Sequence, residues 1–185
     1  IAQSNALTLT HGLFYGALLI FSAFNLLLFF STGTAYYFFN AFYMLATGLF
    51  LCSMAGLSFQ YLWPNVPWLA NMAIPLSEGL STLAFILFGR AFLDIDEAQP
   101  RPSGLLKYLA SFSVLVIALC FVLPYSIVIK IATLYGLFCI VTLFVIGIQR
   151  WLQGYSPAKW YVFAWSTMAI GTCIYALAAF GYLAD

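Results

Sequence analysis

One ionisable side chain lies deep inside an apolar stretch of this sequence: Glu78, near the middle of the run over residues 68–92. If this run is a membrane-spanning helix that rises 1.5 Å per residue, the carboxyl group lies about 15–18 Å below either membrane surface. Acidic groups at such depth are costly, and they commonly mark a substrate pathway or a switch. Asn71 and Pro75 precede Glu78 on the same run.

Two interpretations of Glu78 stay open. In the structural interpretation, a neutral carboxyl group hydrogen-bonds a neighbouring helix and fixes how the helices pack. In the functional interpretation, Glu78 belongs to a polar pocket or a proton-responsive switch whose occupancy changes the packing. Pro75 favours a deformable section, because proline has no amide hydrogen and leaves the carbonyl of Asn71 without its usual partner. That missing bond matters less if Asn71 lies in the first turns of the helix.

Asn25 is the other deeply placed polar side chain, and by helical rise it lies within about 6 Å of Glu78 in depth. We expect it to make an interhelical hydrogen bond, with a ligand role as the alternative. Small residues spaced four apart let another helix backbone approach closely. Two such sets are candidate helix-packing sites: Gly12 with Gly16, and the stripe Gly48, Cys52 and Gly56.

The residue inventory argues against an enzyme. The single histidine, His11, excludes a multi-histidine metal centre, and the four cysteines lie in four different apolar runs, which predicts neither a zinc site nor a disulfide framework. Hydrolase motifs are absent, and both Lys130 and Lys159 lie too near helix ends for a mid-membrane Schiff base. We predict no catalytic residue, metal or cofactor, and the net charge of +1 predicts no nucleic-acid partner.

Composition sets the class of the protein. Of 185 residues, 65% are hydrophobic and 6% charged, which no water-soluble domain of this length could carry. Apolar runs of roughly 20 residues match the length of a helix that crosses a ~30 Å hydrocarbon layer. The sequence therefore predicts an all-α, polytopic transmembrane helix bundle. Its six expected helices cover about residues 10–30, 36–56, 68–92, 105–123, 127–151 and 158–183.

Basic residues predict the orientation, because loops rich in lysine and arginine stay in the cytoplasm. If the amino end lies outside, the connections after the third and fifth runs are cytoplasmic, and Lys130 alone lies outside. The cytoplasmic side then holds the other five of the six basic residues: Arg90, Arg101, Lys107, Arg150 and Lys159.

Four short pieces, over residues 11–16, 36–37, 60–64 and 90–94, combine glycine, tyrosine, tryptophan and charged exits in one order along the helices. In that order they resemble a bacterial family, the seven-transmembrane receptors with diverse intracellular signalling modules. The resemblance covers about residues 11–185. It implies a bacterial inner-membrane module with a periplasmic ligand-binding domain before the helices. It also implies an output domain, such as a diguanylate cyclase, histidine kinase or phosphatase, after a seventh helix, and it carries no catalytic set.

The sequence thus predicts an outer linker over residues 1–10 and, over residues 11–185, a transmembrane module that holds six of seven helices. Its function would be to relay a periplasmic signal by a two-state shift in helix packing, with the stripe over residues 48–56 as a sliding surface. The expected partners are the bilayer, the sensor and output domains of the parent receptor, and a second copy in a homodimer. The alternatives are a small-solute transporter or permease subunit that uses Glu78, and a passive anchor for partner subunits.

Overall fold

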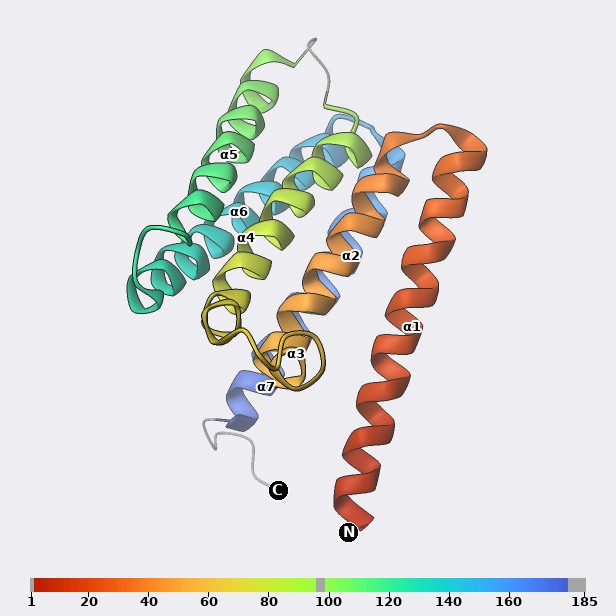
Figure 1. Cartoon of the computed structure of the whole chain (residues 1–185). Helices are drawn as coiled ribbons and strands as arrows, with labels where there is room; N and C mark the ends of the chain where they lie inside the picture. Colours follow the sequence, from red (N-terminus) through yellow and green to blue (C-terminus); the bar gives the residue numbers. More distant parts are fainter. Residues whose placement is uncertain (1, 96–98, 180–185) are drawn as a thin grey trace. The chain divides into compact units, whose positions relative to one another are not determined.

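The computed structural model describes residues 2–95 and 99–179, without the side chains of residues 2–8, 70, 100 and 171–179. Over this range the backbone forms helices and no strand, which confirms the all-α prediction. The chain divides into two compact units, residues 1–139 and residues 140–185. The helices follow each other in the order shown in Figure 1: α1 Ala2–Thr32, α2 Ala35–Met54, α3 Leu57–Tyr61, α4 Pro67–Phe92, α5 Pro100–Leu119, α6 Tyr125–Leu152 and α7 Ser156–Ala179.

Long apolar helices account for most of the chain. Five of them, α1, α2, α4, α5 and α6, are long and apolar enough to cross a membrane within the described residues. The sixth expected helix corresponds to α7, and the last residues of its expected range, 180–183, lie outside the described residues. A multi-pass membrane protein is therefore the class that the fold supports.

Proline chemistry explains why α5 starts earlier than residue 105. Pro100 occupies the first turn of α5, where its missing amide hydrogen would have had no partner anyway. The prolines that suggested a loop therefore start a helix. At its other end α5 stops at Leu119 rather than Leu123, and turns over 120–123 lead into Pro124. The proline disfavours a helical conformation at Leu123, the residue directly before it.

Two further boundaries differ from the expected ones. Helix α1 begins at Ala2 rather than near residue 10, although its membrane-spanning part is Leu9–Thr32. Helix α2 ends at Met54, and Gly56 adopts a left-handed backbone with φ of 74° before the short α3. Glycine is the residue that takes this conformation without steric cost, so Gly56 forms a turn instead of extending a helical stripe.

Helix α4 is the centre of the first unit. It packs against α2 and α5, and α2 also packs against α1. Half of the most apolar part of α4 is buried inside the protein, against 11% for α1. Helix α1 consequently exposes large apolar side chains such as Leu13, Ile20 and Phe30, as expected for a helix that faces lipid.

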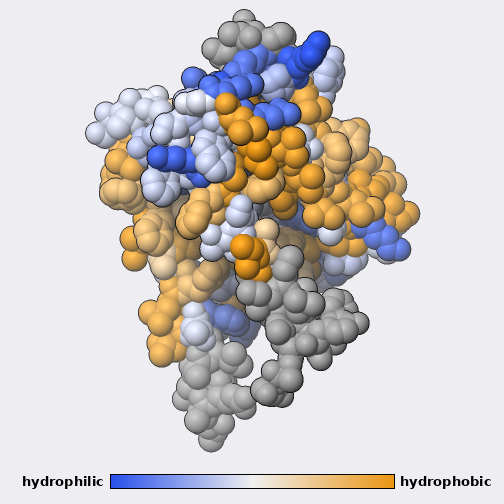
Figure 2. Space-filling view, turned by 180° about the vertical axis from the view of Figure 1, so that it is seen from behind, coloured by the Kyte–Doolittle hydropathy of each residue, from blue (hydrophilic) through white to orange (hydrophobic). Residues whose placement is uncertain are grey.

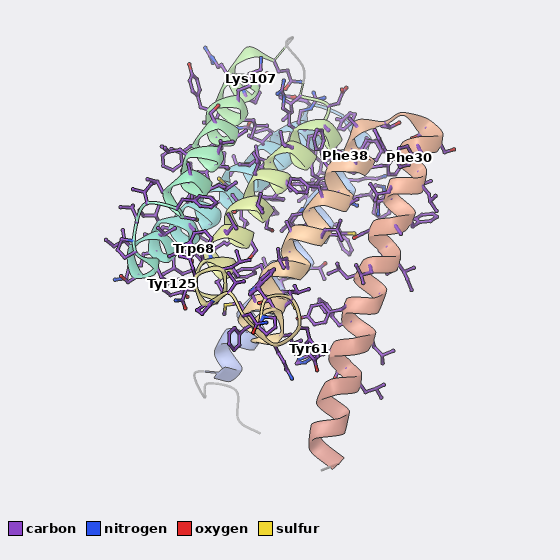
Figure 3. All side chains as sticks on the ribbon, viewed as in Figure 1. Phe30, Phe38, Tyr61, Trp68, Lys107 and Tyr125 are labelled. Carbon is purple, nitrogen blue, oxygen red and sulfur yellow. The ribbon has the colours of Figure 1, made fainter. Side chains whose placement is uncertain are left out.

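The two ends of the first unit carry different side chains. Figure 3 shows Tyr61, Trp68 and Tyr125 at one end and Lys107 at the other. Tyrosine and tryptophan are enriched at membrane interfaces, where the ring is apolar and its polar edge is wet. On the face drawn in Figure 2, hydrophobic residues cover large parts of the coloured surface. This surface suits a protein embedded in lipid.

The second unit is a hairpin of the end of α6 and α7. A left-handed turn at Gly154, with φ of 89°, joins the two helices. A Cβ atom placed on Gly147 of α6 would lie 2.9 Å from Tyr161 Cδ1 of α7, so this glycine allows the close approach of the two helices.

Candidate functional site

Side-chain hydrogen bonds connect neighbouring helices inside the apolar spans of the first unit. We call these bonds the polar network. It consists of Asn25 with Asn40 between α1 and α2, Thr47 with Ser81 between α2 and α4, Glu78 with Thr133 between α4 and α6, and Ser113 with Tyr135 between α5 and α6. Helices α2, α4 and α6 each take part in two of these contacts, so the bonds link the helices in the order α1, α2, α4, α6 and α5.

Glu78 faces α6. The Thr133 hydroxyl donates to Glu78 Oε2 at 3.3 Å, and Glu78 is half-buried. The bond is longer than the 2.5–3.0 Å usual for a hydroxyl donor, so it is weak. A Cβ atom placed on Gly136 would lie 3.8 Å from Glu78 Oε1 and 3.4 Å from Thr82 Oγ1. Helix α6 therefore presents a glycine to the polar side chains of α4.

The contact between α4 and α2 is tighter. The hydroxyl groups of Thr47 and Ser81 lie 2.7 Å apart, the usual length for such a bond. The rings of Tyr43 on α2 and Phe85 on α4 pack with their centroids 5.7 Å apart. Aromatic pairs at this spacing add to the stability that burial provides. We therefore treat α2 and α4 as a firmly joined pair.

Asn25 makes the expected kind of contact, with Asn40. The Asn40 side-chain amide donates to Asn25 Oδ1 at 3.0 Å, and the Asn25 amide donates to the carbonyl of Phe21 at 2.9 Å. The two deep polar residues are thus not brought together, because Asn25 pairs with α2 and Glu78 pairs with α6.

The section of α4 before Glu78 stays helical, although a proline and a serine alter its backbone hydrogen bonding. The helix continues through Pro75, which is fully buried, and Asn71 is exposed in the second turn. The buried hydroxyl of Ser77 donates to the carbonyls of Ala73, at 2.5 Å, and Ile74, at 3.0 Å. Such bonds from serine to its own helix commonly accompany bends. Proline and serine therefore weaken the regular backbone ladder one to two turns before Glu78.

The small residues singled out in the sequence fall into three settings. Nothing lies within 4 Å of a Cβ placed on Gly12 or Gly16, so the described part of the first unit shows no close helix packing at this pair. Gly48 faces α1, since a Cβ there would lie 3.0 Å from Leu18 Cδ2. Cys52 is half-buried, and Gly56 lies in the turn beyond α2.

Sequence reasoning missed the contact between α5 and α6. The Tyr135 hydroxyl lies 3.0 Å from Ser113 Oγ and donates to the carbonyl of Leu109, and both side chains are buried. A signal existed, because Ser113 shares the buried face of α5 with Leu106, Leu109 and Val116 at helical spacing. The described residues contain no group of three histidine, cysteine or acidic side chains that could hold a metal ion.

The chain matches a known protein family over nearly its whole length. The sequence model of a family described as 7TM diverse intracellular signalling matches residues 7–185. No curated protein and no solved structure matches the chain.

Proposed function

Because this chain belongs to the 7TM diverse intracellular signalling family, whose domains sit in multidomain receptors, we propose that it relays a signal across a bacterial inner membrane. A sensor domain before α1 would receive the signal, and an intracellular output domain would read the rearranged helices. The amino end would lie outside, since the predicted cytoplasmic connections hold most of the basic residues. The observation that carries the mechanism is the weak Glu78–Thr133 contact between α4 and α6.

In the proposed mechanism, α4 moves against α6 and stays with α2. Interhelical hydrogen bonds in membranes contribute on average about 0.6 and at most about 1.7 kcal/mol. The 3.3 Å bond from Thr133 to Glu78 belongs at the low end of this range, and the 2.7 Å contact of Thr47 with Ser81 belongs higher. A change of register between two packed helices would therefore break the α6 contact first.

Two features of α4 and α6 support such a movement. At Gly136, next to Glu78 and Thr82, α6 has no side chain that would resist a shift of the two helices. Pro75 and Ser77 weaken the helix just before Glu78, so the part of α4 that carries Glu78 can tilt about them. Asn71, on the far side of Pro75, would belong to the half of α4 that stays still. On α2, Gly48 would serve as the sliding contact with α1.

Replacement of Glu78 by Gln tests this function. Glutamine keeps the size and one acceptor oxygen but cannot carry the charge, so receptor output should change while the amount of folded protein in the membrane does not. Asp94→Asn is the matched control, because it makes the same acid-to-amide change just beyond the end of α4. If Glu78→Gln removes folded protein and leaves output per molecule unchanged, Glu78 has a structural role and the proposed mechanism is wrong.

A further inference from the structure

A cavity lies in the second unit, apart from the polar network. It has a volume of about 350 Å³, and its walls come from the last turn of α6 and the first turns of α7. The lining residues are Trp151, Lys159, Trp160, Val162, Phe163 and Ser166. The volume is at the small end of the range, about 300–1,000 Å³, that binds small molecules.

The cavity joins one positive charge to a largely apolar wall. Lys159 is exposed, and its ammonium nitrogen lies 5.2 Å from the ring centroid of Trp160. Trp151, Trp160 and Phe163 are half or more exposed, so the apolar wall is open on its outer side. A ligand that fits has an anionic group and an apolar part.

The charge of the surrounding hairpin selects an anion. Residues 140–179 contain Arg150 and Lys159 and no aspartate or glutamate. Both cations stack on aromatic rings at the α6–α7 turn, since the Arg150 guanidinium carbon lies 4.8 Å from the centroid of the Tyr155 ring. The proposed orientation places this turn on the cytoplasmic side of the membrane. Basic pockets between membrane helices on that side suit the head groups of anionic lipids.

The length of the cavity favours a ligand that is longer than a head group alone. Lys159 and Ser166 are seven residues apart on α7, which corresponds to about 10 Å along the helix axis. The stretch between them is lined by Val162 and Phe163, which offer no hydrogen bond to a soluble anion. An acyl chain fills such a stretch and gains burial energy, whereas inorganic phosphate does not.

We propose that the cavity at the α6–α7 hairpin binds one anionic phospholipid. Its phosphate lies at Lys159, and one acyl chain runs between Trp151 and Trp160 along Val162 and Phe163. Lipid binding would then fix the geometry of the hairpin at the membrane surface. This site is independent of the proposed movement of α4.

Native mass spectrometry of the full chain in mixed micelles tests the proposal. The probes are phosphatidylglycerol and phosphatidylcholine with the same acyl chains, and the chain should retain one molecule of the anionic lipid in preference. Lys159→Gln should weaken its retention about fivefold, the effect of one basic residue near a membrane surface. Lys159→Arg should retain it, and Phe163→Ala should weaken the retention of both lipids.

The control is Lys107→Gln, which removes the same charge from an exposed position on α5, on the same predicted side of the membrane. If Lys107→Gln weakens retention as much as Lys159→Gln, the lipid binds general surface charge and the site does not exist. Equal retention of the two lipids by the unmodified chain would also overturn the proposal. Displacement of phosphatidylglycerol by millimolar inorganic phosphate would show a plain anion site and overturn the assignment to lipid.

Discussion

Thr133→Val tests the strength of the contact between α4 and α6. Valine has the shape of threonine without the hydroxyl, so the substitution removes the donor to Glu78 Oε2 and leaves the packing nearly intact. The 3.3 Å bond is weaker than an average interhelical bond, and we expect a loss of about 0.5 kcal/mol. If only one of two signalling states contains this bond, the same energy changes their ratio about twofold.

Two measurements on the same variant separate stability from signalling. Reversible unfolding in mixed micelles gives the free energy of unfolding, and the basal output of the full receptor gives the ratio of the two states. Thr167→Val is the matched control, because the Thr167 hydroxyl donates to the carbonyl of Phe163 in its own helix, and Thr167 is exposed. The control should leave basal output unchanged.

Two results would show that the bond from Thr133 to Glu78 does not differ between the two signalling states. A loss above about 2 kcal/mol in unfolding free energy with unchanged basal output would mean that the bond is a structural tie present in both states. Equal effects of Thr133→Val and Thr167→Val on output would mean that the position of the hydroxyl does not matter.

Two further predictions concern helix packing around α4 and α5. Tyr135→Phe removes the buried bonds to Ser113 and Leu109 and should lower the free energy of unfolding by about 1 kcal/mol. Tyr108→Phe, at an exposed position on α5, should leave the free energy of unfolding unchanged. An equal effect of the two substitutions would contradict the buried contact. Gly79→Ala places a Cβ 3.0 Å from Ile117 Cγ1 and should lower the free energy of unfolding by about 1–3 kcal/mol. In Gly12→Ala the new Cβ meets nothing within 4 Å, so this control should leave the free energy of unfolding unchanged or raise it. If Gly12→Ala destabilises the protein more than Gly79→Ala, α4 and α5 do not approach closely at Gly79.

The membrane helices were predictable because each is a long, nearly uninterrupted apolar run. The expected third helix at 68–92 agrees with α4 Pro67–Phe92 within one residue. The start of α5 was not predictable in the same way, because Pro100 can belong either to a loop or to the first turn of a helix. The composition around Pro100 does not distinguish a loop from the first turn of a helix. Which of the two forms depends on whether the residues after Pro100 continue as a helix.

The network was predictable only where a residue is unusual in a membrane span. Glu78 is conspicuous because charges are rare there, and so is Asn25. Their partners are hydroxyl and amide groups that give no such signal. Ser111 and Thr32, for example, donate to the carbonyls of their own helices, so a hydroxyl in a span does not by itself indicate an interhelical bond.

A disulfide between α4 and α6 tests whether α4 signals by moving against α6. In a receptor whose native cysteines are replaced, Thr82→Cys and Gly136→Cys are close enough to be bridged, since a Cβ on Gly136 lies 3.4 Å from Thr82 Oγ1. The control pair is Thr47→Cys with Ser81→Cys, whose hydroxyl oxygens lie 2.7 Å apart across α2 and α4. Oxidation of the 82–136 pair should change receptor output, and reduction should restore it, while the 47–81 pair gives the same output in both states. If output is the same before and after oxidation of the 82–136 pair, or if both pairs change it equally, α4 does not signal by moving against α6.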